Sequence, residues 1–421
     1  MPASFYLVIA SHFVSAFADN ALLLIAIARL IELGLPGWWA PLLKFWFTIS
    51  YVLLAPWIGP LADAIPKARL MASMNGLKFV GAALLLLGVQ PLIAFGIVGV
   101  AAAGYAPAKY GIVTELLPED RLVAANAWTE VTVVCAVLGG TVAGGVLVSS
   151  WFVHLPASEW AQSIVSLIDQ SPTALALPIG VLLILYALGV AFSLGVRAIS
   201  THYVKTWASP AAMLRDFFAA NRLLWRDRQG GVSLAVTTLF WGAGATLQFI
   251  VLRWAQETLK VPLDQAAYLQ GLVAAGVTIG AALAGRWIRL ANTLRVLPLG
   301  VAMGLLVLGM AWVDTLPIAI PLLALIGAFA GFFLVPMNAL LQHRGYQLIT
   351  PGRAVAVQGC NENLSVLLML AVYAAMVAAD VPLNMLLWGF GLVISATMGL
   401  LMLRERLHII ENVASLNDSP R

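Results

Sequence analysis

The 421-residue chain is 62% hydrophobic and only 10% charged, and its mean hydropathy is +0.94. A water-soluble domain carries about 25% charged and 45–50% apolar residues, so the composition excludes a soluble protein and predicts one embedded in a bilayer. The net charge of +4 is too small to indicate a nucleic-acid partner. Both cysteines, Cys135 and Cys360, lie in apolar runs, which argues against a disulfide framework.

A membrane span needs about 20 mostly apolar residues, so a chain of this length has room for about twelve spans. The first apolar run has no basic segment before it and no small-residue cleavage site, which predicts a retained helix rather than a signal peptide. Division at Pro, Gly and charge clusters predicts an all-α integral membrane protein with spans at 5–28, 38–62, 70–88, 91–114, 122–148, 173–196, 231–254, 265–287, 296–313, 317–342, 353–379 and 383–404.

These spans fall into two halves of six helices, residues 1–196 and 231–404. Residues 197–230 join the halves, and residues 405–421 form a tail. The joining segment is basic and places Leu214, Phe217, Phe218 and Trp225 on one helical face, which predicts an amphipathic helix at the membrane interface.

Several landmarks of the first half recur in the second half in the same chain order and direction. Arg121 and Glu130 have the same spacing in the sequence as Arg353 and Glu362. The pair Pro107 and Lys109 likewise has the same spacing as the pair Pro336 and Asn338. Parallel halves related by an axis along the membrane normal are the major facilitator arrangement, in which the substrate site lies between the halves near the midplane. The repeat therefore predicts two parallel six-helix halves of this type.

The basic residues are distributed unevenly between the two sides of the predicted membrane. Most of the 23 Lys and Arg residues fall on the side where the chain begins, and only Arg29, Lys44, Arg253 and Lys260 fall toward the other side. Positive residues are retained on the cytoplasmic side of a membrane. The distribution predicts that both termini are cytoplasmic.

The loop at 59–69 carries an aspartate followed by clustered basic residues, Lys67 and Arg69. Asp63 is placed to accept hydrogen bonds from the first amides of the third span, because helix N-termini attract anions. We expect Asp63, Lys67 and Arg69 to form a latch on the cytoplasmic side rather than to bind substrate.

Charged residues near the bilayer centre cost on the order of 2.5–3.5 kcal/mol each on insertion scales, so each one suggests a function. His12 and Asp19 share one face of the first span, and Asn20 follows directly. Asp19 is interpreted as a proton-coupling carboxylate or as the anchor of a cationic substrate group. The alternative is a residue that only holds helices together.

Four further charges, Lys78, Lys109, Glu130 and Glu362, lie in the inner half of their spans. They predict salt bridges that close the cytoplasmic side and break as it opens, or a cavity in which Lys109 binds an anionic group such as phosphate. Static structural pairs are the alternative. Arg253 lies near the outer end of its span, where an arginine side chain reaches the interface.

Motifs of other functional classes are missing from the sequence. It has no GxxxxGK[ST] sequence, which argues against ATP-driven transport. It has no H-x4-D acyltransferase box, no Gly-x-Ser-x-Gly elbow and no His/Cys cluster with metal-ligand spacing. We therefore expect a transporter rather than an enzyme, with no catalytic residues, no cofactor and no metal.

Five longer segments resemble the bacterial lysophospholipid transporter family of the major facilitator superfamily. They are SAFADNALL (15–23), GYAPAKYGIVTEL (104–116), LFWGAGATLQF (239–249), AGFFLVPMNALLQ (330–342) and AVQGCNENLSVLLML (356–370). The resemblance covers both halves and nearly the whole chain.

The resemblance implies a flippase of the bacterial inner membrane that moves lysophosphatidylethanolamine and related lysolipids from the outer to the inner leaflet. A cytoplasmic acyl-ACP synthetase/acyltransferase would then restore the missing acyl chain. We expect alternating access with lateral entry of the lipid between helices, and a monomeric protein. The residues that the matching motifs place in the cavity are Asp19, Asn20, Lys109, Tyr110, Glu115, Asn338, Asn361 and Glu362.

The sequence departs from the family at Gln248, where an arginine is common, and the nearest basic residue is Arg253. Gln248 remains a candidate for substrate binding, whereas His12, Lys78, Glu130 and Arg253 are candidates for gating or coupling. A proton-coupled exporter of amphipathic drugs or metabolites would use the same buried carboxylates and is the main alternative. A third hypothesis is an accessory subunit that supports the acyltransferase without transporting lipid.

Overall fold

The computed structural model describes residues 1–35, 39–165, 173–197, 209–261 and 263–417. Twelve of its helices are long and apolar enough to cross a membrane. In the first half these are α1 (Ala3–Glu32), α2 (Trp39–Ala64), α3 (Lys67–Leu86), α4 (Pro91–Leu116), α5 (Leu122–Leu147, preceded by the 3-10 turn η1, Glu119–Arg121) and α8 (Ala176–Gly195). In the second half they are α10 (Arg228–Glu257), α11 (Leu263–Trp287), α12 (Leu297–Gly309, between the 3-10 turns η2, Leu290–Val296, and η3, Met310–Trp312), α13 (Leu316–Leu348), α14 (Pro351–Ala378) and α15 (Leu383–Asn417).

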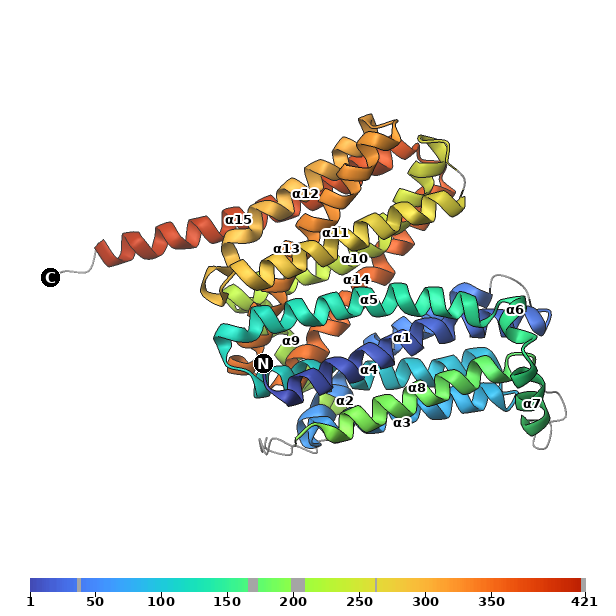
Figure 1. The fold of residues 1–421 in the computed structure, drawn as a ribbon. Helices are drawn as coiled ribbons and strands as arrows, with labels where there is room; N and C mark the ends of the chain where they lie inside the picture. The colour runs from blue at the N-terminus through green and yellow to red at the C-terminus, as the bar shows by residue number, and fades with distance from the viewer. Residues whose placement is uncertain (36–38, 166–172, 198–208, 262, 418–421) are drawn as a thin grey trace.

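The helices form two six-helix bundles that lie side by side (Figure 1). We call the side where α1 begins and α15 ends the terminal side. The short helices α6 (Ser150–Val153) and α7 (Pro156–Val165) lie at the opposite end, which we call the far side. The predicted twelve spans and the division into six plus six are confirmed. Helices α1, α10, α13 and α15 extend well beyond the predicted spans, because polar turns continue them past the apolar stretches, whereas α5, α8 and α12 are shorter than expected.

Proline and side-chain caps set many of the helix ends. Pro91, Pro210 and Pro351 stand at or next to the first residue of their helices, where the missing amide hydrogen costs nothing. Asp227 caps α10 by accepting from the Gly230 amide, and both oxygens also accept from Arg344. Burial alone would raise the pKa of Asp227, but these hydrogen bonds outweigh burial and lower the pKa.

The joining segment contains a helix, α9 (Pro210–Arg226), as the sequence predicts. Ala220 and Leu224 are buried against the ends of α10, α13 and α14, while Leu214, Phe218 and Trp225 are exposed. Phe217, expected on the exposed apolar face, instead packs partly into this contact. The first part of the segment, 198–208, lies outside the described residues.

The halves contact each other through the terminal side. Asn126 of α5 and Gln342 of α13 exchange two hydrogen bonds of 3.0 Å. Asp63 of α2 accepts from the Gly352 amide at 3.0 Å and from the Thr350 hydroxyl, both at the start of α14. The amide that donates to Asp63 therefore belongs to the other half. The prediction that Asp63 accepts from the first amides of the third span is wrong. A helix N-terminus does bind this carboxylate, as predicted, but the helix is α14, so the contact joins the two halves.

Close helix contact within the second half depends on glycine. Gly276 and Gly280 of α11 face α13, and a Cβ atom at Gly280 would lie 1.9 Å from the Ala328 carbonyl oxygen. Gly327 and Gly331 of α13 make the reciprocal approach to the backbone of α11. Small residues allow such backbone contact in membranes, and here they fix these two helices as one unit.

Replacement of Gly280 by alanine should destabilise the protein, because backbone atoms cannot move aside as a flexible side chain can. We expect a loss of roughly 1–3 kcal/mol, the usual range for overpacking, measured as a lower thermal unfolding midpoint in detergent. Gly244→Ala is the matched control, since a Cβ atom at Gly244 would meet nothing within 4 Å. Equal midpoints for the two variants would contradict this account.

The contacts at Asp63 predict that Thr350→Val shifts the protein toward conformations that open on the terminal side. Valine keeps the shape of threonine but cannot donate to Asp63. Spin labels on the exposed residues Asp120 and Tyr346 would measure the opening in a cysteine-free background. Ser73→Ala, which removes a hydroxyl bonded only within α3, is the control. Unchanged label distances in Thr350→Val would mean that this bond does not hold the halves together.

Candidate functional site

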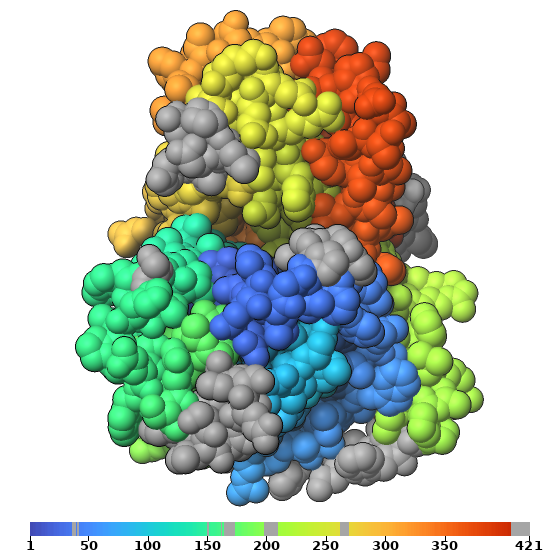
Figure 2. Space-filling model, turned by 90° about the vertical axis from the view of Figure 1, so that its right-hand side faces the viewer, coloured from blue at the N-terminus to red at the C-terminus, as the bar shows by residue number. Residues whose placement is uncertain are grey.

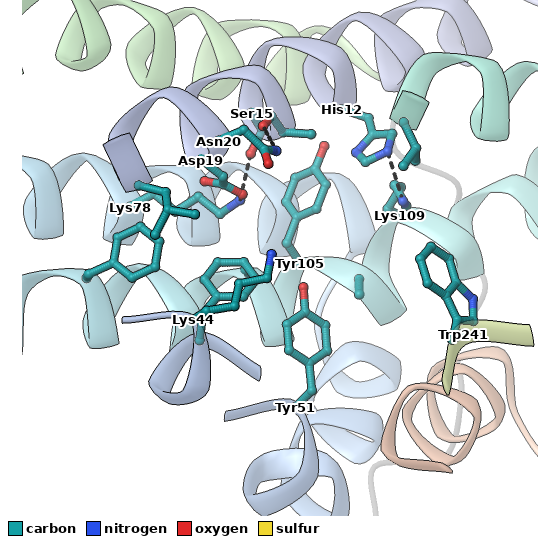
Figure 3. A pocket seen from close by; sticks show the side chains of 17 residues that line it. His12, Ser15, Asp19, Asn20, Lys44, Tyr51, Lys78, Tyr105, Lys109 and Trp241 are labelled. Atoms are coloured by element: carbon teal, nitrogen blue, oxygen red, sulfur yellow. Dashed lines mark hydrogen bonds and ion pairs between the residues drawn. The ribbon is translucent and has the colours of Figure 1, made fainter. Parts of the chain in front are cut away.

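A cavity of about 260 Å³ lies between the halves. Helices α1 to α5 supply almost all of its lining, and Trp241 of α10 closes it from the second half. Figure 3 shows its polar side chains pointing toward a shared space. The charged and polar lining residues are His12, Ser15, Asp19, Asn20, Lys44, Tyr51, Lys78, Tyr105 and Lys109, and the apolar ones include Leu23, Phe47, Phe95 and Val133.

Asp19 forms an ion pair with Lys78, with 2.5 Å between Oδ2 and Nζ. The Tyr186 hydroxyl donates to the other oxygen of Asp19 at 2.9 Å, and Lys78 also donates to the Ser15 hydroxyl at 2.8 Å. The lysine side chain is 2% exposed and the aspartate 12%. Both charges are therefore removed from solvent and compensated, and Asp19 keeps a small face toward the cavity.

Lys109 lies deeper along the cavity wall, with its Nζ atom 3.1 Å from Nε2 of His12. The ring of Tyr110 lies beneath the same ammonium group, 3.9 Å from Nζ to the ring centroid. Glu130 of the same half and Glu362 of the other half also interact with Lys109 electrostatically. One hydrogen bond joins these two nitrogens, so His12 and Lys109 act as a pair in this part of the wall.

These contacts give a different pairing from the one expected for the four inner charges. Lys78 pairs with Asp19 rather than with a glutamate, and Lys109 faces His12. The ion pairs on the terminal side instead include Lys67 with Glu115, at 2.5 Å, Lys67 with Asp63, at 3.9 Å, and Glu119 with His343, at 3.6 Å. Sequence spacing gave the depth of each charge but not the rotation of its helix, and rotation decides which charges meet.

The predicted substrate-binding residues separate into two groups. Asp19, Asn20 and Lys109 line the cavity, and Tyr110 supports Lys109. The other predicted binding residues lie elsewhere and bond within the protein. Glu115 pairs with Lys67, Asn338 and Glu362 both accept from Gln358, Asn361 bonds to Asn221 and Trp225 near α9, and the Gln248 carbonyl accepts from Gln270.

The residues predicted for gating or coupling also separate. His12 and Lys78 line the cavity and belong to its charge network. Asp63 and Lys67 lie at the terminal-side contact, whereas Arg69 is exposed there. Arg253 pairs with Glu257 on its own helix at 2.6 Å, away from the cavity lining.

Several lining residues were not identified from the sequence. The sequence places Lys44 only toward the far side and does not single out Tyr51, Tyr105 or Trp241, although Tyr105 and Trp241 lie within two of the segments that resemble the family. A signal was present for Lys44, because a lysine inside an apolar run is as unusual as Asp19. Aromatic residues are so common in membrane helices that sequence gives no comparable signal for the other three.

Comparison with known proteins agrees with this architecture. The family model of the Major Facilitator Superfamily matches residues 8–359. The chain is 39% identical over 378 residues to "Lysophospholipid transporter LplT" of Yersinia pestis (strain Pestoides F), with 89% of this chain and 87% of the relative covered. The same figures hold for the LplT of Yersinia pseudotuberculosis serotype I (strain IP32953).

Solved structures show the same fold at low sequence identity. A variant of the E. coli fucose:proton symporter FucP superposes with a TM-score of 0.71 at 15% identity, over 94% of this chain and 97% of that one. A bacterial homologue of the iron transporter ferroportin in an outward-facing state gives 0.69 at 15% identity, over 96% and 99%. The chain belongs to the major facilitator superfamily and, within it, to the family of the LplT lysophospholipid transporters.

The Asp19–Lys78 pair predicts non-additive effects on stability. Asp19→Asn and Lys78→Met should each cost about 3–5 kcal/mol, because each leaves one uncompensated buried charge. The double variant should lose much less than the sum, since neither charge remains. Unfolding in mixed detergent micelles would measure this cycle. Additive losses would show that the two side chains do not stabilise each other.

Proposed function

We propose that this member of the major facilitator superfamily transports lysophospholipids, with lysophosphatidylethanolamine as its principal substrate. The observation that carries the proposal is the cavity between the halves, where lysines, one aspartate and aromatic side chains share a small space with apolar walls. A lysophospholipid has a compact charged head and a single apolar chain, and the lining matches both. The sequence identity to the LplT proteins supports the same substrate class.

The cavity is too small for a whole lipid. Pockets that enclose a drug-sized ligand measure about 300–1,000 Å³, whereas this one measures about 260 Å³. The headgroup therefore enters the cavity while the acyl chain remains against apolar helix surfaces or the bilayer. This arrangement favours lateral entry of the lipid between helices during alternating access.

The contacts between the halves support inward transport of the lipid. The hydrogen bonds at Asp63 and Asn126 close the terminal side, and the excess of basic residues on that side supports a cytoplasmic location for both termini. In this orientation the cavity receives lipid from the outer leaflet of the bacterial inner membrane and releases it to the inner leaflet. A cytoplasmic acyl-ACP synthetase/acyltransferase would then re-acylate the product, and we propose that the transporter acts as a monomer.

Proteoliposomes that contain labelled lysophosphatidylethanolamine in the outer leaflet would test this function. Wild type should transfer the label to the inner leaflet. Asp19→Asn should reduce the rate at least tenfold, because it leaves Lys78 unpaired beside the headgroup. Asp314→Asn, an equivalent change at an exposed residue before α13, should leave the rate unchanged.

The same assay with and without a proton gradient distinguishes the drug exporter, which would also use the buried carboxylate Asp19. Failure of wild type to move lysolipid, together with export of a cationic amphiphile driven by the proton gradient, would overturn the proposal in favour of the exporter.

A further inference from the structure

Lys44 lies nearer the far side of the cavity than Lys109 does. Helix α2 begins on the far side at Trp39, so Lys44 lies roughly 8 Å along the helix from that end. Lys109 lies roughly 27 Å from the far-side start of α4 at Pro91. A molecule that enters from the far side, the face seen in Figure 2, therefore reaches Lys44 before Lys109.

Lys44 also differs in its partners. Lys78 has Asp19, and Lys109 has His12 together with the field of Glu130 and Glu362. Within the described part of the chain, no ion pair or hydrogen bond joins Lys44 to another residue. Its side chain is exposed to the cavity space, and Figure 3 shows it extending toward Asp19, Tyr51 and Tyr105.

The charges of the lining favour an anion at this position. The lining contains three lysines and one aspartate, and that aspartate is already paired with Lys78. A ligand phosphate would meet an unpaired ammonium group at Lys44. A ligand amine would meet the positive charges of the lysines, and Asp19 could not compensate it because Asp19 is already paired with Lys78. Charge-assisted hydrogen bonds from lysine are a common means of binding phosphate.

Three aromatic rings in and beside the cavity reinforce this preference. A ligand ammonium could bind to the face of a ring by a cation–π interaction. The rings of Phe47, Tyr105 and Tyr110 each already face a lysine of the protein, at 5.9, 5.2 and 3.9 Å from Nζ to the ring centroid. These rings are therefore less available to the amine of a substrate.

We propose that Lys44 is the residue that first binds the phosphate of the substrate, and so sets the affinity for phosphate-bearing single-chain lipids at the far-side mouth of the cavity. This inference rests on the proposed transport of lysophospholipids and adds a specificity-determining residue to it. From Lys44 the phosphate can pass along the cavity wall to Lys109, which lines the same cavity more deeply. The alternative is a lysine that merely anchors the end of α2 at the membrane surface.

Transfer of labelled lysophosphatidylethanolamine into proteoliposomes, measured over a range of substrate concentrations, tests the inference. Lys44→Gln should raise the half-saturating concentration roughly tenfold, the usual effect of losing one charge-assisted hydrogen bond, with little change in the maximal rate. Lys44→Arg should restore most of the affinity. Lys260→Gln is the matched control, because Lys260 is an exposed far-side lysine that does not line the cavity.

Two further measurements make the outcome decisive. Added salt should weaken substrate binding in wild type more than in Lys44→Gln, since an exposed charge contact is screened by salt. Thermal unfolding midpoints in detergent should match between wild type and Lys44→Gln, which separates lost affinity from lost folding. Wild-type transfer with an unchanged half-saturating concentration in Lys44→Gln would overturn the role of Lys44 while leaving the transport function intact.

The source of the phosphate is distinguished by a soluble competitor. We expect sn-glycerol 3-phosphate, which lacks an acyl chain, to inhibit lysolipid transfer only at concentrations far above those of the lipid. Inhibition at equal concentration, lost in Lys44→Gln, would assign the site to soluble phosphate esters and overturn the commitment to lipid. Absence of any lysolipid transfer by wild type would instead contradict the proposed function itself.

Discussion

The ion pair between Asp19 and Lys78 is the interaction on which the rest of the site depends. A lone charge in the membrane interior is costly, so a carboxylate in α1 requires a cation at the same depth, and α3 supplies it. Tyr186 and Ser15 satisfy remaining hydrogen-bonding positions of the pair and thereby draw α8 into the same contact. The need to compensate one charge thus fixes the relative rotation of three helices.

Pairing of Lys78 with Asp19 leaves the three lysines of the cavity with unequal charge compensation. Lys78 is neutralised, Lys109 is shared with a histidine and two distant glutamates, and Lys44 faces open space. The site therefore combines a rigid charged wall with a cation that is free to accept an anionic group. Contacts between the halves lie on the other side of this wall, at Asp63 and Asn126. Hydrogen bonds of this kind break at modest cost, which suits an interface that opens and closes.

The fold was predictable because a bilayer imposes its constraints along the sequence. Span length, the repeat of Arg121 and Glu130 as Arg353 and Glu362, and the amphipathic joining segment are all local patterns, and the helices follow them. The site was only partly predictable. Asp19, Asn20 and Lys109 stood out as polar residues in apolar runs, and they do line the cavity. The family resemblance placed Asn361 and Glu115 in the cavity as well, but they bond elsewhere. The sequence of one helix does not determine how that helix is rotated against its neighbours.

The charge distribution in the cavity favours a lipid carrier over a drug exporter. An exporter of cationic amphiphiles needs an available carboxylate, but Asp19 is occupied by Lys78 and Tyr186. If Asp19 were released to bind a cation, Lys78 would be left unpaired in an apolar wall. The free-energy cost of that buried charge exceeds the binding energy of a weakly bound cation. A phosphate requires no such exchange, because Lys44 is already unpaired among the described residues. The apolar walls beside it accommodate the start of an acyl chain whose remainder stays in the bilayer. The same geometry that makes a cation a poor substrate therefore makes a phosphate-bearing single-chain lipid a good one.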